Sequence, residues 1–237
     1  MTMNSANAPQ QLPLGISLRD EARFENFQTG QNGLVCEMLR QAALGTGEQF
    51  LYIWGSEGAG CSHLLQAACH AAEPARRTAV YLPLQELLNL SPVILEGMEH
   101  LNLVCVDNVE AISGNPVWEE ALFHLYNRIR QEQNTLIVAA NSAPRQLQIQ
   151  LPDLVSRLSW GAVFSVAQLN DEDKVQAIRL RAKIRGFELP EDVARYMVHH
   201  DSRSMVDLCL TLERLDQASL TAQRKVTIPF IKQEMGW

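Results

Sequence analysis

The chain alternates short apolar runs with longer segments in which apolar residues recur every three or four positions. The apolar runs are residues 50–54, 78–82, 101–106, 135–140 and 162–166. Runs that are apolar at nearly every position are typical of strands buried on both faces of a sheet. Helical spacing is found at residues 34–44, 64–72, 84–90, 93–98, 117–130 and 152–158. This alternation predicts an α/β fold with a five-stranded parallel sheet and helices on both of its faces.

The pattern changes after residue 168. Helical spacing continues over 170–185, 190–199 and 205–220, and Pro229 begins a last short helix, but no further apolar run occurs. Asn170 and Asp171 are the predicted caps of the first helix, and Ser202 or Ser204 is that of the third. We therefore divide the chain into a disordered N-terminal arm (residues 1–22), an α/β core (23–168) and an all-helical subdomain (169–237).

Charge limits the choice of partners. The 237 residues carry a formal net charge of −7, and no basic run interrupts them apart from one stretch on the helix predicted over 170–185. That stretch is interpreted as a solvated face, with a protein contact surface as the alternative. An acidic chain is a poor stand-alone binder of duplex DNA, so proteins and nucleotides are the expected partners.

Cysteine usage and hydropathy predict a cytoplasmic protein. The 5 cysteines are odd in number and have no metal-ligand spacing, which favours reduced, buried thiols. We expect no membrane segment, because no apolar run approaches the roughly 18 residues of a span.

A glycine-rich loop joins the first apolar run to the next helical segment. Gly55-Ser56-Glu57-Gly58-Ala59-Gly60-Cys61-Ser62 matches the phosphate-binding pattern G-x-x-x-x-G-K-[ST] except that Cys61 replaces the lysine. Backbone N–H groups and a helix N-terminus bind phosphate without side chains. A cysteine has neither the reach nor the charge to serve the terminal phosphate. The loop therefore predicts a nucleoside diphosphate holder with little or no hydrolysis of its own, and a glycine-rich turn without a ligand is the alternative.

The nucleotide contacts expected from this loop extend into the following helix. The predicted contacts are Gly55, Glu57, Gly58, Ala59, Gly60, Cys61, Ser62 and His63. The hydroxyl of Ser62 can hold Mg²⁺, which prefers oxygen ligands.

Two strand ends add polar groups to the same site. The third apolar run ends in Asp107, as in a Walker B motif whose acid helps to hold Mg²⁺, whereas a helix or turn cap is the alternative role. The next residue, Asn108, stands where ATPases usually have the acid that activates water, and an amide cannot act as a general base. Asn141 follows the fourth run, at the strand tip that lies beside a γ-phosphate in this architecture, although Asn is also a common turn former.

Arg157 lies near the end of a short predicted helix. Such an arginine commonly caps carbonyl groups. Alternatively it acts as an arginine finger in the nucleotide site of a neighbouring molecule, where it can accelerate hydrolysis about 10³–10⁵-fold. Near the N-terminus, residues 11–16 are either a loosely packed arm or a linear peptide whose apolar side chains dock in a groove of another protein.

Together these motifs resemble the AAA+ family, and within it the DnaA group of replication initiators. The resemblance covers residues 23–220 and rests on Phe24-Glu25-Asn26-Phe27 with Gly30 and Asn32, the loop at 55–62, residues 104–108, Asn141 and residues 156–161. It implies a P-loop core followed by a small helical lid. It also implies a base pocket near Phe27, Gly30 and Asn32, with ADP as the expected nucleotide.

The chain departs from the group at a second phosphate-binding cation. The lid arginine of the family falls near Val206, which cannot contact phosphate, and Arg203, one helical turn earlier, is the candidate replacement. The triphosphate-specific cations at positions 61 and 206 are thus both missing.

Within the DnaA group, the sequence resembles short regulators that lack the initiator's C-terminal DNA-binding domain. That resemblance implies that Gln11, Leu12, Leu14 and Ile16 bind the sliding clamp (β subunit) of DNA polymerase III. It implies further that Arg157 promotes hydrolysis of ATP bound to DnaA, which makes the chain a negative regulator of replication initiation. Self-association is also expected, whereas sequence-specific DNA binding is not. The alternatives are an autonomous AAA+ ATPase, such as a helicase loader, and a scaffold with a vestigial nucleotide site.

Overall fold

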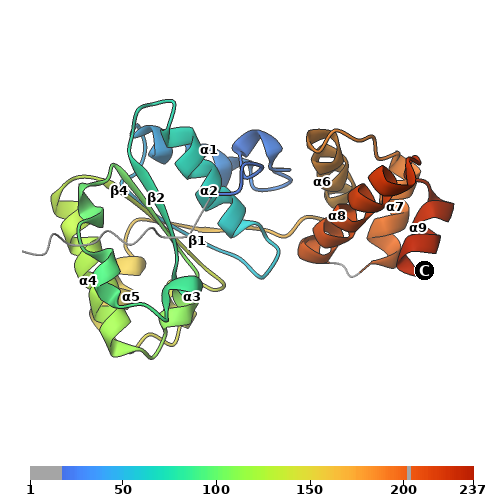
Figure 1. The fold of residues 1–237 in the computed structure, drawn as a ribbon. Helices are drawn as coiled ribbons and strands as arrows, with labels where there is room; N and C mark the ends of the chain where they lie inside the picture. Colours follow the sequence, from blue (N-terminus) through green and yellow to red (C-terminus); the bar gives the residue numbers. More distant parts are fainter. Residues whose placement is uncertain (1–17, 202–203) are drawn as a thin grey trace, which may run out of the picture.

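The computed structural model describes residues 18–201 and 204–237, and an α/β core lies beside a helical subdomain in it (Figure 1). The core is built on one five-stranded sheet in the order β2-β3-β4-β1-β5, and every pairing is parallel. The strands are β1 (Phe50–Trp54), β2 (Ala79–Pro83), β3 (Leu103–Asp107), β4 (Thr135–Ala140) and β5 (Ala162–Ser165). The predicted fold class is confirmed.

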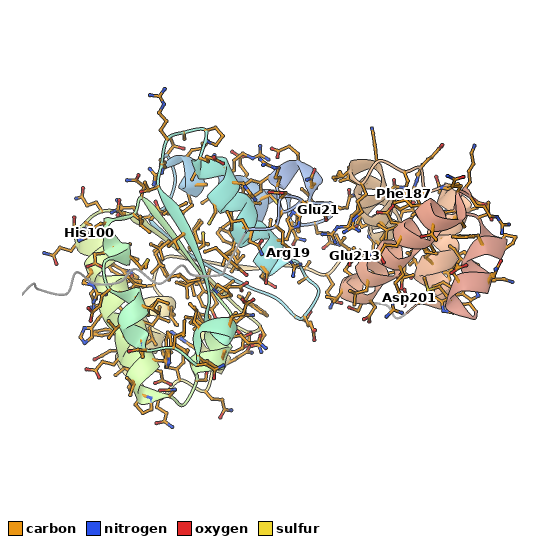
Figure 2. All side chains as sticks on the ribbon, in the orientation of Figure 1. Arg19, Glu21, His100, Phe187, Asp201 and Glu213 are labelled. Atoms are coloured by element: carbon orange, nitrogen blue, oxygen red, sulfur yellow. The ribbon has the colours of Figure 1, made fainter. Side chains whose placement is uncertain are left out.

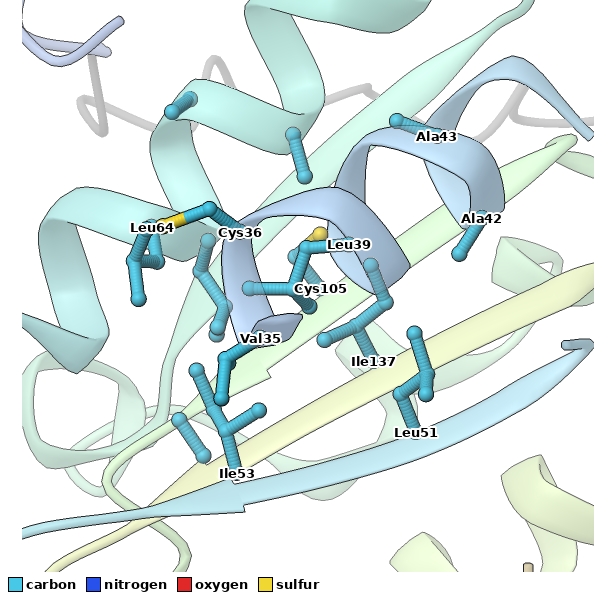
Figure 3. Packing of buried hydrophobic residues seen from close by; sticks show 14 of the residues in the cluster. Val35, Cys36, Leu39, Ala42, Ala43, Leu51, Ile53, Leu64, Cys105 and Ile137 are labelled. Atoms are coloured by element: carbon cyan, nitrogen blue, oxygen red, sulfur yellow. The ribbon is translucent and has the colours of Figure 1, made fainter. Parts of the chain in front are cut away.

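Each strand buries alternate side chains on opposite faces of the sheet, because successive Cβ atoms of a strand point in opposite directions. On one face, α1 (Gly33–Leu44) and α2 (Cys61–Ala72) cover Leu51, Ile53 and Ile137. Figure 3 shows α1 lying across these strands, with Val35 and Leu39 directed at them. The other face packs against α4 (Pro116–Gln131) and α5 (Pro152–Leu158).

The segment between β2 and β3 differs from the prediction. The helix expected over 84–90 is confined to α3 (Leu84–Leu87), and the one expected over 93–98 is wrong. Its place is taken by two 3-10 turns, η2 (Pro92–Leu95) and η3 (Met98–His100). Gly97 separates them in the left-handed conformation at φ 82°, which an α-helix cannot accommodate.

Four helices form the C-terminal subdomain around a separate apolar cluster. They are α6 (Asp171–Ile184), α7 (Glu191–His200), α8 (Met205–Ala222) and α9 (Ile228–Met235). As predicted, the Asn170 side chain caps α6 by accepting from the N–H of Asp173, and Ser204 caps α8 by accepting from that of Val206. The remaining described turns are η1 (Phe24–Asn26), η4 (Val109–Ile112) and η5 (Pro144–Gln146).

Part of the basic stretch on α6 is engaged in ion pairs rather than solvated. Arg185 pairs at 3.1 Å with Glu21, which the sequence analysis assigned to the disordered arm but which lies against the core, and at 2.7 Å with Glu213 of α8. Arg181 pairs with the same Glu21 at 3.4 Å. Figure 2 places Glu21 on the side of the core that faces the helical subdomain, close to Glu213. The arginines therefore tie the subdomain to the core.

Two structural features, a membrane-spanning helix and a metal centre, are absent from the described residues. None of the helices within 18–201 and 204–237 has the length and apolar character of a membrane span. In the same ranges no cluster of three or more His, Cys, Asp or Glu side chains forms a metal centre.

Candidate functional site

The glycine-rich loop connects the carboxyl end of β1 to α2 and is tied to the sheet. Gly55 donates its N–H to the carbonyl of Ala140 at 3.2 Å, which places the start of the loop beside the tip of β4. A Cβ at Gly55 would lie 2.7 Å from the carbonyl oxygen of Val166. Gly60 has φ +100°, and a Cβ there would meet the Phe27 ring at 2.7 Å. Both positions therefore require glycine.

The N-terminus of α2 is free to bind an anion. Its N-cap is Gly60, which has no side chain to cap the helix. The first N–H groups of an α-helix have no intrahelical acceptor, and the helix dipole adds partial positive charge there. Residues 61–63 supply these groups. This end of the helix thus fits the phosphates of a nucleotide.

Cys61 leaves the loop without a positive charge. Burial, followed by the negative charge of Asp107, raises the pKa of the Cys61 thiol to about 12, and Glu110 adds to this effect. The thiol is therefore protonated and neutral at physiological pH. Among the described residues, no lysine or arginine side chain forms a hydrogen bond or ion pair with residues 55–62.

Asp107 is buried at the end of β3 and already has two hydrogen-bond partners. Its Oδ2 accepts from the Tyr81 hydroxyl at 2.6 Å and its Oδ1 from the N–H of Asn108 at 2.9 Å. Burial, with the nearby charge of Asp107 as a second cause, raises the pKa of Tyr81, so the phenol stays protonated. Ser62 lies close to the same phenol. Each carboxylate oxygen keeps acceptor capacity, so Ser62 and Asp107 fit a Mg²⁺ ion.

Glu110 is a residue of this site that the sequence analysis missed. It lies on η4, and its Oε2 accepts the N–H of Asn141 at 3.1 Å. Asn141 is the residue predicted to lie beside a terminal phosphate, and the bond places a carboxylate there. The only sequence signal was an acid three positions after Asp107, which a strand pattern does not distinguish from a surface residue.

The predicted base pocket lies where the core meets the helical subdomain. The Phe27 ring contacts Gly60 and lies 5.3 Å from the His63 ring, centroid to centroid. Burial lowers the pKa of His63, and its Nε2 lies 2.9 Å from the carbonyl oxygen of Arg23, so the ring is neutral. Gly30 faces Asp173 of α6: a Cβ on the glycine would lie 3.0 Å from the aspartate Oδ2.

Asn32 has a structural role in this region. Its side-chain amide donates to the carbonyl of Ala167 at 2.9 Å and accepts the N–H of the same residue at 2.8 Å. The amide therefore fixes the segment that follows β5 to the start of α1. Because both polar atoms of the side chain are engaged, Asn32 contributes shape rather than hydrogen bonds to a base.

The helical subdomain reaches the loop through the first turn of α8. A Cβ at Gly58 would lie 3.7 Å from the backbone nitrogen of Met205 and 3.8 Å from the Ser204 hydroxyl. Gln168, in the segment that leads to α6, donates from its side chain to the carbonyl of Glu57 in the loop at 3.1 Å. Val206, in that first turn, is 45% exposed and brings only hydrocarbon. Arg203, the predicted replacement cation, lies outside the described residues.

Arg157 belongs to a different region of the core. It lies in the last turn of α5, which in Figure 1 is next to α4 and remote from the helical subdomain. Within the described ranges its guanidinium has no hydrogen bond or ion pair, and no partner is found for the exposed Arg145 either. Arg130 stacks over the exposed Trp160, with 3.9 Å from the guanidinium carbon to the ring centre. We call these four residues the arginine face.

A buried carboxylate holds α5 in place. Glu119 of α4 is 1% exposed and accepts backbone N–H groups from Gly114, Gln150 and Leu151 at 2.7–3.1 Å. Leu151 is the N-cap of α5, so the bonds fix the start of the helix that carries Arg157. Sequence analysis missed Glu119 because its acceptor role depends on a loop about 30 positions further along the chain.

The N-terminal peptide lies outside the described residues. This holds for all its predicted clamp contacts: Gln11, Leu12, Leu14 and Ile16.

Comparison with known families assigns both parts of the chain. Residues 18–165 match the family model of the bacterial DnaA ATPase domain. Residues 171–235 match the model of the Hda lid domain. The two matches meet between β5 and α6.

Solved structures agree with this fold. Domain III of the Thermotoga maritima replication initiation protein DnaA superposes with a TM-score of 0.82 at 23% identity, covering 93% of this chain and 98% of that one. AMPPCP-bound DnaA from Aquifex aeolicus gives 0.70 at 23% identity over 83% and 65% of the two chains. The Thermotoga maritima RuvB Holliday junction branch migration motor gives 0.65 at 14% identity over 86% and 67%. At these identities the likeness concerns the fold.

Proposed function

Because this chain belongs to the bacterial DnaA ATPase family and its C-terminal part matches the Hda lid domain, we propose that the protein is a cytoplasmic negative regulator of DNA replication initiation. It acts on DnaA with ATP bound. Together with the DNA-loaded sliding clamp, it places Arg157 in the nucleotide site of DnaA and promotes hydrolysis there. The product, DnaA with ADP, no longer initiates.

One observation carries this proposal: among the described residues, the phosphate loop forms no hydrogen bond or ion pair with a lysine or arginine side chain, and Arg157 has no hydrogen-bond or ion-pair partner. The loop keeps its glycines and the free N-terminus of α2 but has a neutral thiol at position 61. Arg157, in contrast, extends from a firmly held helix and has no internal ion pair among the described residues. An arginine finger needs this arrangement, because it must stabilise charge that belongs to another molecule.

The protein's own loop then serves as a structural nucleotide site. Backbone amides at the start of α2 bind the phosphates of a nucleoside diphosphate, with ADP as the expected form. Ser62 and Asp107 would hold Mg²⁺, which supplies charge neutralisation when bound. Because α8 begins beside Gly58, the nucleotide stabilises one orientation of the lid against the core.

The N-terminal peptide brings the regulator to its place of action. We assign clamp binding to Gln11, Leu12, Leu14 and Ile16, whose apolar side chains fit the peptide-in-groove mode of recognition. Recruitment by a clamp left on newly replicated DNA couples inactivation of DnaA to replication itself.

Replacement of Arg157 by alanine tests the central step. ATP hydrolysis by DnaA is measured with loaded clamps and either the wild-type protein, Arg157→Ala or the control Arg214→Ala. Arg214 is an exposed arginine on α8, away from the arginine face. We expect Arg157→Ala to abolish stimulation while clamp binding is retained, and Arg214→Ala to stimulate normally. Persistent stimulation by Arg157→Ala would show that the finger assignment is wrong.

The same assay without DnaA decides between regulator and motor. A regulator leaves ATP intact when it is alone. Robust turnover by the purified protein would instead favour the autonomous ATPase, such as a helicase loader.

A further inference from the structure

Glu110 occupies an anion position at the edge of the nucleotide loop. Its carboxylate binds the N–H of Asn141 at 3.1 Å, and the neighbouring residue, Ala140, accepts the N–H of Gly55 at 3.2 Å. The strand tip and the start of the loop are thus joined by a single peptide unit. The backbone amide of Asn141 is therefore already bonded to a side-chain carboxylate.

The charged groups that act on this point, among the described residues, are both acidic. Asp107 lies at the end of the neighbouring strand, buried, with its oxygens bonded to a phenol and an amide rather than to a cation. Cys61, the first residue of α2, has a thiol where the phosphate-binding pattern has a lysine, so it supplies no positive charge. Over the described residues, no ion pair neutralises Glu110.

We propose that Glu110 makes the loop selective for a nucleoside diphosphate and excludes the corresponding triphosphate. The inference rests on the diphosphate-holding role proposed above and identifies the residue responsible for it. The α- and β-phosphates bind the glycine loop and the free amides of α2, which carry partial positive charge. A γ-phosphate would extend towards Asn141, where it meets a carboxylate and finds the amide taken.

The exclusion has two physical components. Like charges in a partly buried site repel each other more strongly than in water. In addition, a triphosphate can claim the Asn141 amide only by displacing Glu110 from its hydrogen bond. A site can select the diphosphate by making an unfavourable contact with the triphosphate, without binding the diphosphate more tightly.

Two substitutions separate charge from shape. Glu110→Gln removes the charge while its amide oxygen can still accept from Asn141. Cys61→Lys restores a cation at the loop. Glu132→Gln is the matched control, because Glu132 is an exposed acid at the end of α4, near the amino end of β4, whereas Glu110 bonds at the carboxyl end of that strand.

Dissociation constants for ADP and for the ATP analogue AMPPCP, both with Mg²⁺, are measured by titration calorimetry on the full chain. We expect the wild type and Glu132→Gln to prefer ADP. Glu110→Gln should reduce that preference about tenfold by tightening the binding of AMPPCP, and Cys61→Lys should reduce it further.

The possible results are distinguishable. An unchanged ADP-to-AMPPCP ratio in Glu110→Gln, with ADP binding intact, would overturn the role of Glu110 and leave the proposed function standing. Weaker AMPPCP binding in Glu110→Gln would also overturn it, because the carboxylate would then assist the triphosphate. Failure of the wild type to bind either nucleotide would refute the diphosphate site of the proposed function, and this inference with it.

Discussion

The phosphate loop and the arginine face lie in different parts of the same core, and their described charged side chains have opposite signs. At the loop, Asp107 and Glu110 face a neutral thiol, so binding depends on backbone amides and on glycines that leave room for them. At the arginine face, Arg145 and Arg157 have no acidic partner among the described residues. Several arginines elsewhere in the fold are paired, as Arg185 is with Glu21 and Glu213.

Under the proposed function, this difference is what would let an ATPase fold serve as an activator. Phosphoryl transfer needs a cradle for phosphates and cations that stabilise the transition state. In this chain the cradle is kept at one site and an unpaired cation at another. Among the described residues, neither site combines the phosphate cradle with the cations. Each prediction that follows tests one of the two sites.

The largest effect is expected from the carboxylate beneath the arginine face. Glu119→Ala removes the buried carboxylate that accepts the N–H groups of Gly114, Gln150 and Leu151. We expect the free energy of unfolding to fall by about 3–5 kcal/mol, measured by urea denaturation. Glu119→Gln, which keeps one acceptor oxygen, should lose less. A loss below about 1 kcal/mol in the alanine variant would mean that α5 is held by its apolar contacts instead.

The next effect concerns the glycines of the loop. Gly60→Ala combines a left-handed backbone conformation with a Cβ that would lie 2.7 Å from Phe27. We expect a loss of about 1–3 kcal/mol in stability and weaker ADP binding. Gly33→Ala is the control, since a Cβ there meets nothing within 4 Å, and it should be neutral or slightly stabilising. Equal behaviour of the two variants would show that the loop adapts its backbone.

The sequence predicted the sheet and the loop well, for local reasons. Strands such as β4 are buried at every position, so their apolar runs identify them directly. The P-loop pattern is likewise contiguous, and its glycines are required by contacts to neighbouring residues. The helix expected over 93–98 failed because Gly97 interrupts the periodicity that suggested it.

The polar network could not be predicted in the same way. Glu110 binds a residue 31 positions away and Glu119 one that is 32 positions away. The spacing between such partners is set by the fold and leaves no local pattern. The same applies to Arg185. Its charge predicted a solvated surface, but in the structure it forms an ion pair with Glu21, which is distant in the sequence.

A smaller effect concerns the thiol at the loop. Burial raises the pKa of Cys61 from 9.0 to about 12, so the folded state favours the protonated thiol. This contribution to stability is fully present below pH 9 and is lost as the pH rises towards 12. Alkylation of Cys61, followed by peptide mass spectrometry, should accelerate about tenfold per pH unit beyond pH 9 in the folded protein. In urea the rate should level off near pH 9, and a plateau at that pH in the folded protein would contradict the assignment.

The smallest expected effect is a difference in stability among alanine variants of the arginines in the arginine face. Arg130 stacks on Trp160 at 3.9 Å and so contributes to the fold, whereas no intramolecular contact of that kind involves Arg145 or Arg157 in the described ranges. Arg130→Ala should therefore reduce the free energy of unfolding by about 0.5–1 kcal/mol, and Arg145→Ala and Arg157→Ala should leave it unchanged within error. Urea denaturation followed by tryptophan fluorescence measures all three. A loss in Arg157→Ala as large as that in Arg130→Ala would mean that Arg157 supports its own fold. The contrast with the phosphate loop would then disappear, because an arginine that the fold needs is not free to serve the nucleotide of another protein.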